Sequence, residues 1–239
     1  MVTGGASGIG RACVVRLAEA GAAVVVVDRD ADAAEVVAKE VGGTALAVDL
    51  SDLASLDSLD LDVDILVNNA GLQHVAPVHE FPVDRFSYIV RLMLEAPFRL
   101  VRGALPHMYD RGWGRIVNVS SVHGLRASAF KSAYVSAKHG LEGLSKVIAL
   151  EGAPHGVTSN CVNPAYVRTP LVEGQIADQA TAHGLSEEDV VEQVMLAPAA
   201  IKRLIEPAEV AELAAYLCSD AARFANGSSY VLDGGWSAR

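Results

Sequence analysis

The sequence has few cysteines, few aromatic residues and no long apolar run. Its three cysteines, Cys13, Cys161 and Cys218, lie far apart and form no Cys-x-x-Cys pair. This spacing disfavours a disulfide framework or a zinc site and indicates buried thiols in a reducing cytoplasm. The longest apolar run, residues 22–27, is too short for a membrane helix, and no signal segment stands at the start. We therefore expect a cytoplasmic protein with no membrane attachment and no metal site.

Basic residues are also scarce relative to acidic ones. The chain has 19 Lys and Arg against 29 Asp and Glu, which gives a formal net charge of −10. Phosphate neutralisation needs clustered Lys and Arg, so this balance argues against a nucleic-acid partner. With 239 residues, 51% of them hydrophobic, the chain is long enough for one core. We expect a single domain over residues 1–239.

Short β-branched runs alternate with helical patterns along the chain. We expect strands at residues 22–27, 44–48, 65–67, 115–119, 156–162 and 229–232. We expect helices at residues 9–20, 32–40, 83–109, 132–151 and 207–218. This alternation predicts an α/β fold, a Rossmann-like doubly wound parallel sheet with helices on both faces.

Two stretches depart from this regular pattern. Only three residues precede Gly4, so we expect the first strand, which is central in such a sheet, to be truncated. Residues 172–205 are long, mixed in charge and follow Pro170. They are expected to form a helical lid over the site.

Residues 3–10 read Thr-Gly-Gly-Ala-Ser-Gly-Ile-Gly, a Gly-x-x-x-Gly-x-Gly turn that enters a helix. Such a turn brings the backbone and helix N–H donors close to a pyrophosphate, although alone it could be a flexible turn. Eighteen residues after Gly10, Asp28 ends the next strand. A carboxylate there can bind the adenosine ribose and repel a 2′-phosphate, which predicts NAD. Asp28 could instead cap a helix, and Arg29 weakens the argument because arginine can accept that phosphate.

Polar and small residues end the next two strands. Asp49 either meets the adenine amino group or caps a turn, and both possibilities stay open. Residues 68–71 read Asn-Asn-Ala-Gly, which suits a backbone packed against a dinucleotide but is also typical of turns.

Tyr134 and Lys138 stand four residues apart on an expected helix and therefore share one face. An ammonium near a phenol favours the phenolate and lowers the tyrosine pKa, which makes Tyr134 a candidate acid/base. Ser121, at the end of an expected strand, can orient the same substrate oxygen. Pairs with this spacing occur by chance on many helices, but the upstream phosphate loop and the serine strengthen the hypothesis.

These motifs, with residues 163–170, resemble the short-chain dehydrogenase/reductases over essentially the whole chain. The resemblance implies hydride transfer at the nicotinamide C4, with Tyr134 as acid/base, Lys138 on the nicotinamide ribose and Ser121 on the substrate. It also implies a homotetramer. The implied cofactor site comprises Gly4, Ser7, Gly8, Ile9, Gly10, Asp28, Asp49, Leu50, Asn68, Ala70, Gly71, Tyr134, Lys138, Val167 and Thr169.

The chain departs from the family pattern at two positions. Ala165 stands where glycine is common, a mild change. Met93 stands where many members carry an asparagine that supports a proton path from the lysine. Met93 also fits an apolar stripe, so we expect it in the core.

Within the family, the chain most resembles the bacterial D-3-hydroxybutyrate dehydrogenases. The resemblance implies that Gln73, His123, Lys131 and Gln175 hold the carboxylate of a small hydroxy acid, together with Ser121 on the reacting oxygen. Each of these residues alone could be an ordinary loop or surface side chain. The alternatives are a reductase of another 3-oxo compound, such as an acyl thioester, and an idle nucleotide-binding scaffold.

Overall fold

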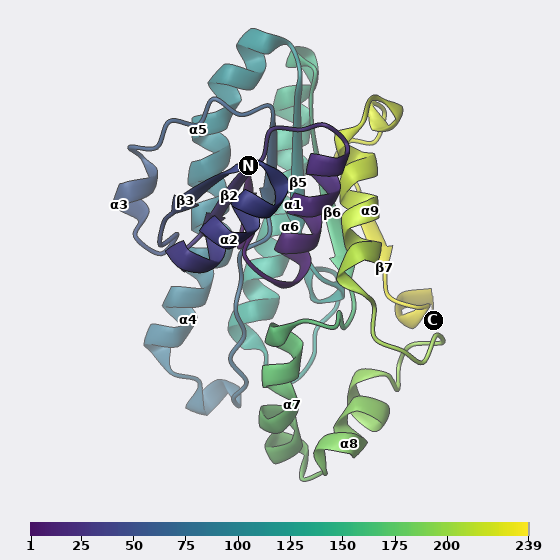
Figure 1. Ribbon diagram of the computed structural model, residues 1–239. Helices are drawn as coiled ribbons and strands as arrows, with labels where there is room; N and C mark the ends of the chain where they lie inside the picture. Colours follow the sequence, from purple (N-terminus) through teal and green to yellow (C-terminus); the bar gives the residue numbers. More distant parts are fainter. Residues whose placement is uncertain (239) are drawn as a thin grey trace.

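Seven parallel strands form one sheet in the order β3-β2-β1-β4-β5-β6-β7 (Figure 1). We describe it from a computed structural model that covers residues 1–238, without the side chains of residues 182 and 183. The strands are β1 (Val2–Thr3), β2 (Val25–Asp28), β3 (Thr44–Ala47), β4 (Ile65–Asn68), β5 (Gly114–Val119), β6 (Val157–Pro164) and β7 (Ser229–Leu232). The doubly wound parallel sheet is confirmed.

The strands at the switch point of the sheet compare with the prediction as follows: the second starts later than expected, and the first is as short as expected. The strand expected over residues 22–27 begins at Val25, because its neighbours offer pairing partners only from Thr44 and Val2 onward. The first strand, β1, is short as expected and still pairs with both β2 and β4. The chain crosses from β3 to β4 on the other side of β1, so the strand order reverses there. Ligands bind at the carboxyl ends of the strands at such a switch point.

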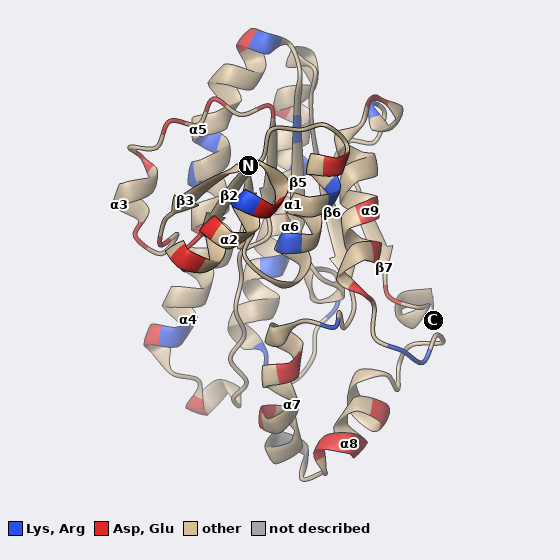
Figure 2. Cartoon of the chain, viewed as in Figure 1, with Lys and Arg blue, Asp and Glu red and all other residues tan. Residues whose placement is uncertain are grey.

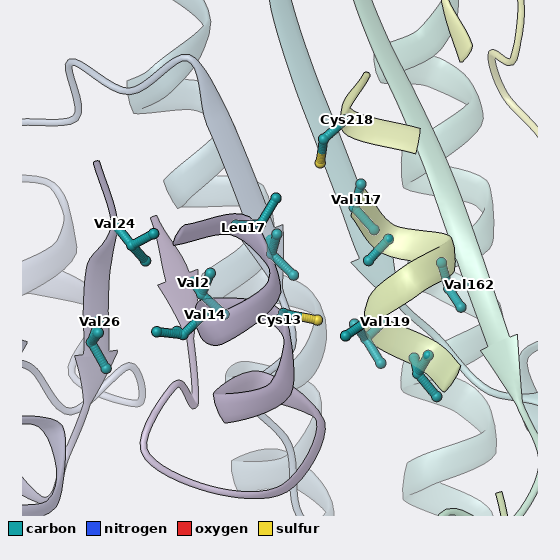
Figure 3. Close-up of a cluster of buried hydrophobic side chains, with 14 of the residues drawn as sticks. Val2, Cys13, Val14, Leu17, Val24, Val26, Val117, Val119, Val162 and Cys218 are labelled. Carbon is teal, nitrogen blue, oxygen red and sulfur yellow. The ribbon is translucent and has the colours of Figure 1, made fainter. Parts of the chain in front are cut away.

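Helices cover both faces of the sheet (Figure 1). They are α1 (Gly8–Glu19), α2 (Ala31–Val41), α3 (Leu53–Leu56), α4 (Val83–Val90), α5 (Ala96–Arg111), α6 (Ser132–Gly152), α7 (Pro170–His183), α8 (Glu187–Asp189) and α9 (Pro207–Cys218). On one face, α1, α2 and α9 bury a cluster that includes Val14 and both Cys13 and Cys218 (Figure 3). On the other face, α5 and α6 bury residues such as Leu100 and Ile148 against the sheet.

The single helix expected over residues 83–109 is interrupted, and that prediction was wrong. A π-helical turn, η2 (Arg91–Glu95), separates α4 from α5. Pro97 has no N–H to donate, and its ring crowds the carbonyl of Met93 four residues earlier. The chain widens before the proline, and π-turns of this kind occur often at functional sites.

The segment from α7 to the π-turn η5 (Val190–Met195) projects from one end of the body (Figure 1) and carries acidic residues on α7 and α8 (Figure 2). It has a small apolar cluster of its own that includes Val190 and Met195. Its two ends are hydrogen-bonded to each other. Arg168 N donates to Ile205 O at 2.8 Å, and Ile205 N donates to Tyr166 O at 3.0 Å. That this segment is a lid remains a prediction.

Candidate functional site

The glycine loop lies at the carboxyl end of β1, where the switch point predicts a ligand. Gly4 and Gly8 have positive φ angles of 61° and 51°, which favour glycine. A Cβ at Gly10 would lie 2.0 Å from the carbonyl oxygen of Gly4, so Gly10 lets α1 pack onto the loop. A cavity is lined by Gly4, Ser7, Gly8 and Ile9 of this loop, whereas Gly10 lies outside the cavity lining. The first N–H groups of α1 face this loop, as an anion site requires.

Asp28 and Arg29 line the same cavity at the end of β2. The Asp28 carboxylate accepts hydrogen bonds from the backbone N–H groups of Ala6 and Asp30, each at 3.2 Å. These bonds fix the carboxylate beside the glycine loop, in the position where a ribose would lie.

Asp49 caps a turn, and its contact with adenine stays a prediction. It accepts hydrogen bonds from the backbone N–H of Ser51 at 2.8 Å and from its hydroxyl at 2.7 Å, which lower the pKa of Asp49. It therefore caps the turn, and it also lines the cavity beside Leu50. Farther along the sheet, Ala70 and Gly71 line the cavity as well.

Asn68 does not line the cavity. Its side chain lies within the sheet, where Nδ2 donates to Oδ1 of Asn118 at 2.9 Å. Asn69 lines the cavity instead, and its Nδ2 donates to the carbonyl oxygens of Thr3 at 2.9 Å and Gly4 at 3.2 Å. Side chains alternate along a strand, so a one-residue difference at its end exchanges an inward for an outward position.

Ser121, Tyr134 and Lys138 come together at the middle of the cavity. Ser121 follows β5 and begins the turn η3 (Val122–Gly124), while the other two lie one turn apart on α6. The Lys138 ammonium lies 5.6 Å from the centre of the Tyr134 ring and donates to the Val119 carbonyl at 2.6 Å.

The protonation of this group differs from the sequence-based expectation. Burial raises the pKa of Tyr134 to about 12, and a hydrogen bond with Ser121 offsets only part of the rise. Burial also lowers the pKa of Lys138 to about 8. In the free protein desolvation therefore outweighs the effect of the lysine on the phenol. The tyrosine is protonated at neutral pH, which is the form needed to donate a proton to a carbonyl.

Gln73, His123, Lys131 and Gln175 all line the part of the cavity beside Tyr134. The sequence places these residues up to a hundred positions apart, and the fold brings them together. Lys131 is buried, and its Nζ donates to the Tyr166 hydroxyl at 3.0 Å. Within residues 1–238 it forms no ion pair with a carboxylate.

The two glutamines differ in how they are held. Both polar atoms of the Gln73 amide are buried and lack a hydrogen-bond partner in the described structure. The Nε2 of Gln175 donates to the Leu171 carbonyl of its own helix at 3.1 Å. Gln73 is therefore the amide that a ligand would satisfy first.

Both ring nitrogens of His123 already have hydrogen-bond partners, whereas its predicted role requires one of them to donate to the substrate. Its Nε2 lies 2.8 Å from the Ser128 hydroxyl and its Nδ1 lies 3.3 Å from the Ser121 hydroxyl. Burial and the Lys131 charge lower the pKa of His123 to about 3, so the ring is neutral. Donation to a substrate requires the ring to exchange one of these partners.

Tyr166 is a cavity residue that the site prediction did not include. Its ring stacks on Trp236 with centroids 6.3 Å apart, and Trp236 also meets the edge of His123 at 5.6 Å. Tyr166 lies in the 163–170 stretch that carries the family resemblance, which was the available signal. Val167 and Thr169 from this stretch also line the cavity. Met93 is buried beside Ile89, as expected, and reaches the cavity wall next to Gly71.

The cavity as a whole has a volume of about 470 Å³ and extends from the glycine loop to α7. Its glycine-loop end is lined by Gly4, Ser7 and Gly8, and its other end by Tyr134 and Lys131. Among the described residues, no group of three or more His, Cys, Asp or Glu side chains could hold a metal ion. In the same part of the chain, no helix is both long and apolar enough to cross a bilayer.

Comparison with known proteins gives a family and several relatives. The model of the short chain dehydrogenase family matches residues 1–180. The chain is 45% identical to the D-beta-hydroxybutyrate dehydrogenase of Rhizobium meliloti (strain 1021), over 100% of this chain and 98% of that protein. It is 41% identical to the D-beta-hydroxybutyrate dehydrogenase of Cupriavidus necator, over 100% of this chain and 97% of that protein.

A solved structure shares the fold. A tryptophan variant of the actinorhodin polyketide ketoreductase with NADPH superposes with a TM-score of 0.94 at 29% identity, covering 100% of this chain and 96% of that one.

Proposed function

Because the chain belongs to the short chain dehydrogenase family, a family of nicotinamide-dependent oxidoreductases, we propose that it interconverts (R)-3-hydroxybutyrate and acetoacetate with NAD. Two relatives that span the whole chain carry the name of this activity. The observation that supports this substrate is the presence of Lys131 and Gln73 in one cavity with Tyr134. The ammonium is buried beside the Tyr166 hydroxyl, and the amide is buried with no partner among the described residues. A substrate carboxylate satisfies both groups, which otherwise cost free energy.

The residues of the chain divide the chemistry between them. Ser121 orients the substrate oxygen, and the Tyr134 hydroxyl donates a proton to it in reduction or accepts one in oxidation. Lys131 and Gln73 fix the other end of the acid, so the reacting carbon is presented to the phenol in one orientation. The bound nicotinamide supplies the hydride acceptor or donor.

The substrate proposal is tested by kcat/KM for four compounds. These are 3-hydroxybutyrate, its methyl ester, 3-hydroxyhexanoate and a 3-hydroxyacyl thioester. The free four-carbon acid should be the best substrate, because the ester and thioester have no anionic carboxylate for Lys131 and the longer acid must fit beside Tyr166. An ester or thioester that matches the free acid would contradict the carboxylate site and favour the broader reductase.

The proposed preference for NAD rests on Asp28. Asp28→Ala should narrow the preference for NAD over NADP by about ten-fold, because a 2′-phosphate no longer meets a carboxylate. The measurement is kcat/KM with both cofactors. Asp32→Ala is the matched control, since Asp32 is an exposed acid on the first turn of α2. Equal use of the two cofactors by the wild type would refute the preference.

We expect a homotetramer in the cytoplasm by family resemblance. Exposed apolar side chains on α5 and α6, among them Phe98, Val147 and Leu150, offer surface that partners could cover. The three free cysteines are all buried, which suits a reducing compartment. Light scattering of the purified protein measures the assembly.

A further inference from the structure

A carboxylate occupies a core position on α6, one helical turn beyond Lys138. Glu142 is only 4% exposed and lies between α6 and strands β6 and β7. Acidic side chains are almost never this deeply buried unless they are paired. Neither the cofactor site nor the substrate site described above uses this residue.

Both oxygens of Glu142 are held by donors from the sheet. Oε1 accepts from Asn163 Nδ2 at 2.5 Å, and Oε2 accepts from the Ser229 hydroxyl at 2.6 Å. Short bonds of this kind are typical of an ionised acceptor. Asn163 Nδ2 also donates to the backbone carbonyl of Ser121 at 2.9 Å. The carboxylate is therefore linked to the strand end that carries the serine.

The space around Glu142 is closed on its remaining side by the turn after Ser121. A Cβ at Gly124 would lie 2.8 Å from Glu142 Oε1 and 2.5 Å from the Ser120 hydroxyl. Because glycine has no Cβ, the turn can pack closely against the Glu142 carboxylate. Because Glu142 is almost fully buried, its charge acts in a poorly screened environment.

Lys138 is a buried cation that needs such a charge. Its ammonium donates to a neutral backbone carbonyl, that of Val119. The groups that face it are Tyr134 and Glu142 on α6, Cys161 on β6, and His123 behind the tyrosine ring. The packed faces of α4 and η2 contribute apolar side chains, among them Ile89 and Met93.

Among these groups, Glu142 alone can supply a negative charge at neutral pH. Burial and the Glu142 charge raise the pKa of the Cys161 thiol far above its usual range, so the thiol is neutral. Tyr134 and His123 are neutral for the reasons given above. One helical turn places the Cβ atoms of Lys138 and Glu142 about 5–6 Å apart on one face of α6.

We propose that Glu142 is a positioning residue whose fixed negative charge keeps Lys138 protonated beside Tyr134, while its link through Asn163 holds the Ser121 backbone in place. The proposal concerns the acid/base group and does not depend on which alcohol is the substrate. It accounts for an acid at a helix position that packing alone would fill with an aliphatic residue. Cys161 and Glu142 both raise the pKa of Lys138 against the effect of burial, and of the two only Glu142 is charged at neutral pH.

The first test is the pH profile of kcat for alcohol oxidation in the wild type and in Glu142→Gln. Glutamine has the same shape, accepts from Asn163 and donates to Ser229. Oxidation needs Tyr134 to accept a proton, so kcat rises with pH. Without the carboxylate Lys138 loses its charge at lower pH, the phenolate loses its nearby cation, and the rise should move up by about one pH unit. Identical midpoints in the two proteins would overturn the proposal.

Two further variants separate charge from packing. Glu151→Gln removes an exposed acid from the end of the same helix and should leave the midpoint unchanged. Glu142→Asp keeps the charge on a shorter side chain, so its midpoint should stay near that of the wild type even if its melting temperature falls. A shift as large in Glu142→Asp as in Glu142→Gln would mean that packing, and not charge, is responsible.

A second measurement needs no substrate. The pKa of Lys138 falls from 10.5 to about 8 on burial, so between these values the unfolded chain binds more protons. The free energy of unfolding should therefore rise with pH across this window. In Glu142→Gln the rise should begin about one pH unit lower, as melting temperatures would show. The difference should vanish in a Lys138→Met background, and its persistence there would refute the proposal whatever the substrate proves to be.

Discussion

Tyr134→Phe should lower kcat by about 10²–10⁴-fold, with NAD binding nearly unchanged. The substitution removes one hydroxyl, the group that exchanges a proton with the substrate oxygen. The ring remains and continues to pack beside Ala133 and Met93. The glycine loop, Asp28 and Lys138, which we assign to the cofactor, are untouched.

The measurements are steady-state kcat and NAD affinity by fluorescence titration. Tyr216→Phe is the matched control, because Tyr216 lies exposed on α9, away from the cavity. The pH dependence adds a second check. The pKa of Tyr134 is about 12 in the free protein, so wild-type oxidation should still be increasing above neutral pH. A Tyr134→Phe enzyme that keeps half of its activity would remove the phenol from the mechanism.

Lys131→Ala should raise KM for 3-hydroxybutyrate by roughly 10- to 100-fold and should change the rate with an uncharged alcohol much less. A hydrogen bond to a charged group contributes about 1.5–3 kcal/mol, which corresponds to that range of affinity. Lys146→Ala is the control, since Lys146 is an exposed lysine on α6, the helix that Lys131 precedes. An equal loss with the acid and the uncharged alcohol would show that Lys131 acts on the fold or on the cofactor.

Stability provides an independent view of the same residue. Lys131 is 4% exposed and donates to the Tyr166 hydroxyl, so its charge is buried without a counter-ion among the described residues. Lys131→Met keeps most of the side-chain volume and removes that charge. Its melting temperature should be equal to or higher than that of the wild type, as expected where function is retained at the expense of stability. A clear decrease would assign Lys131 a structural role.

Much of the fold could be predicted because parallel strands leave a strong pattern. Runs such as residues 116–117 are buried on both faces of the sheet and are therefore wholly apolar. The glycine loop was visible for a different reason, since Gly10 admits no side chain and Gly4 needs a positive φ. Both are local requirements that a single stretch of chain can express.

The features that escaped prediction depend on contacts between distant stretches. The sequence did not show whether Asn68 or Asn69 faces the cavity, because that depends on which side of the strand end meets the glycine loop. Tyr166 gains its importance from Lys131, and Glu142 from donors on β6 and β7. The π-turn at residues 91–95 did have a local cause in Pro97, but an apolar helical period masked it. A buried polar residue cannot be identified until its partner is placed.

The hydrogen bonds that join Tyr166 and Arg168 to Ile205 give residues 170–205 a closed neck. The segment also has a small apolar cluster of its own, and the N–H groups of Ala200 and Ile201 bond it to the carbonyl of Gly234 near the C-terminus. We expect such a segment to open as a unit, at a lower free energy than the global unfolding of the sheet. Substitutions at Val190 or Met195 can change how often the cavity is exposed to solvent, while the strands that hold Ser121 and the glycine loop stay folded.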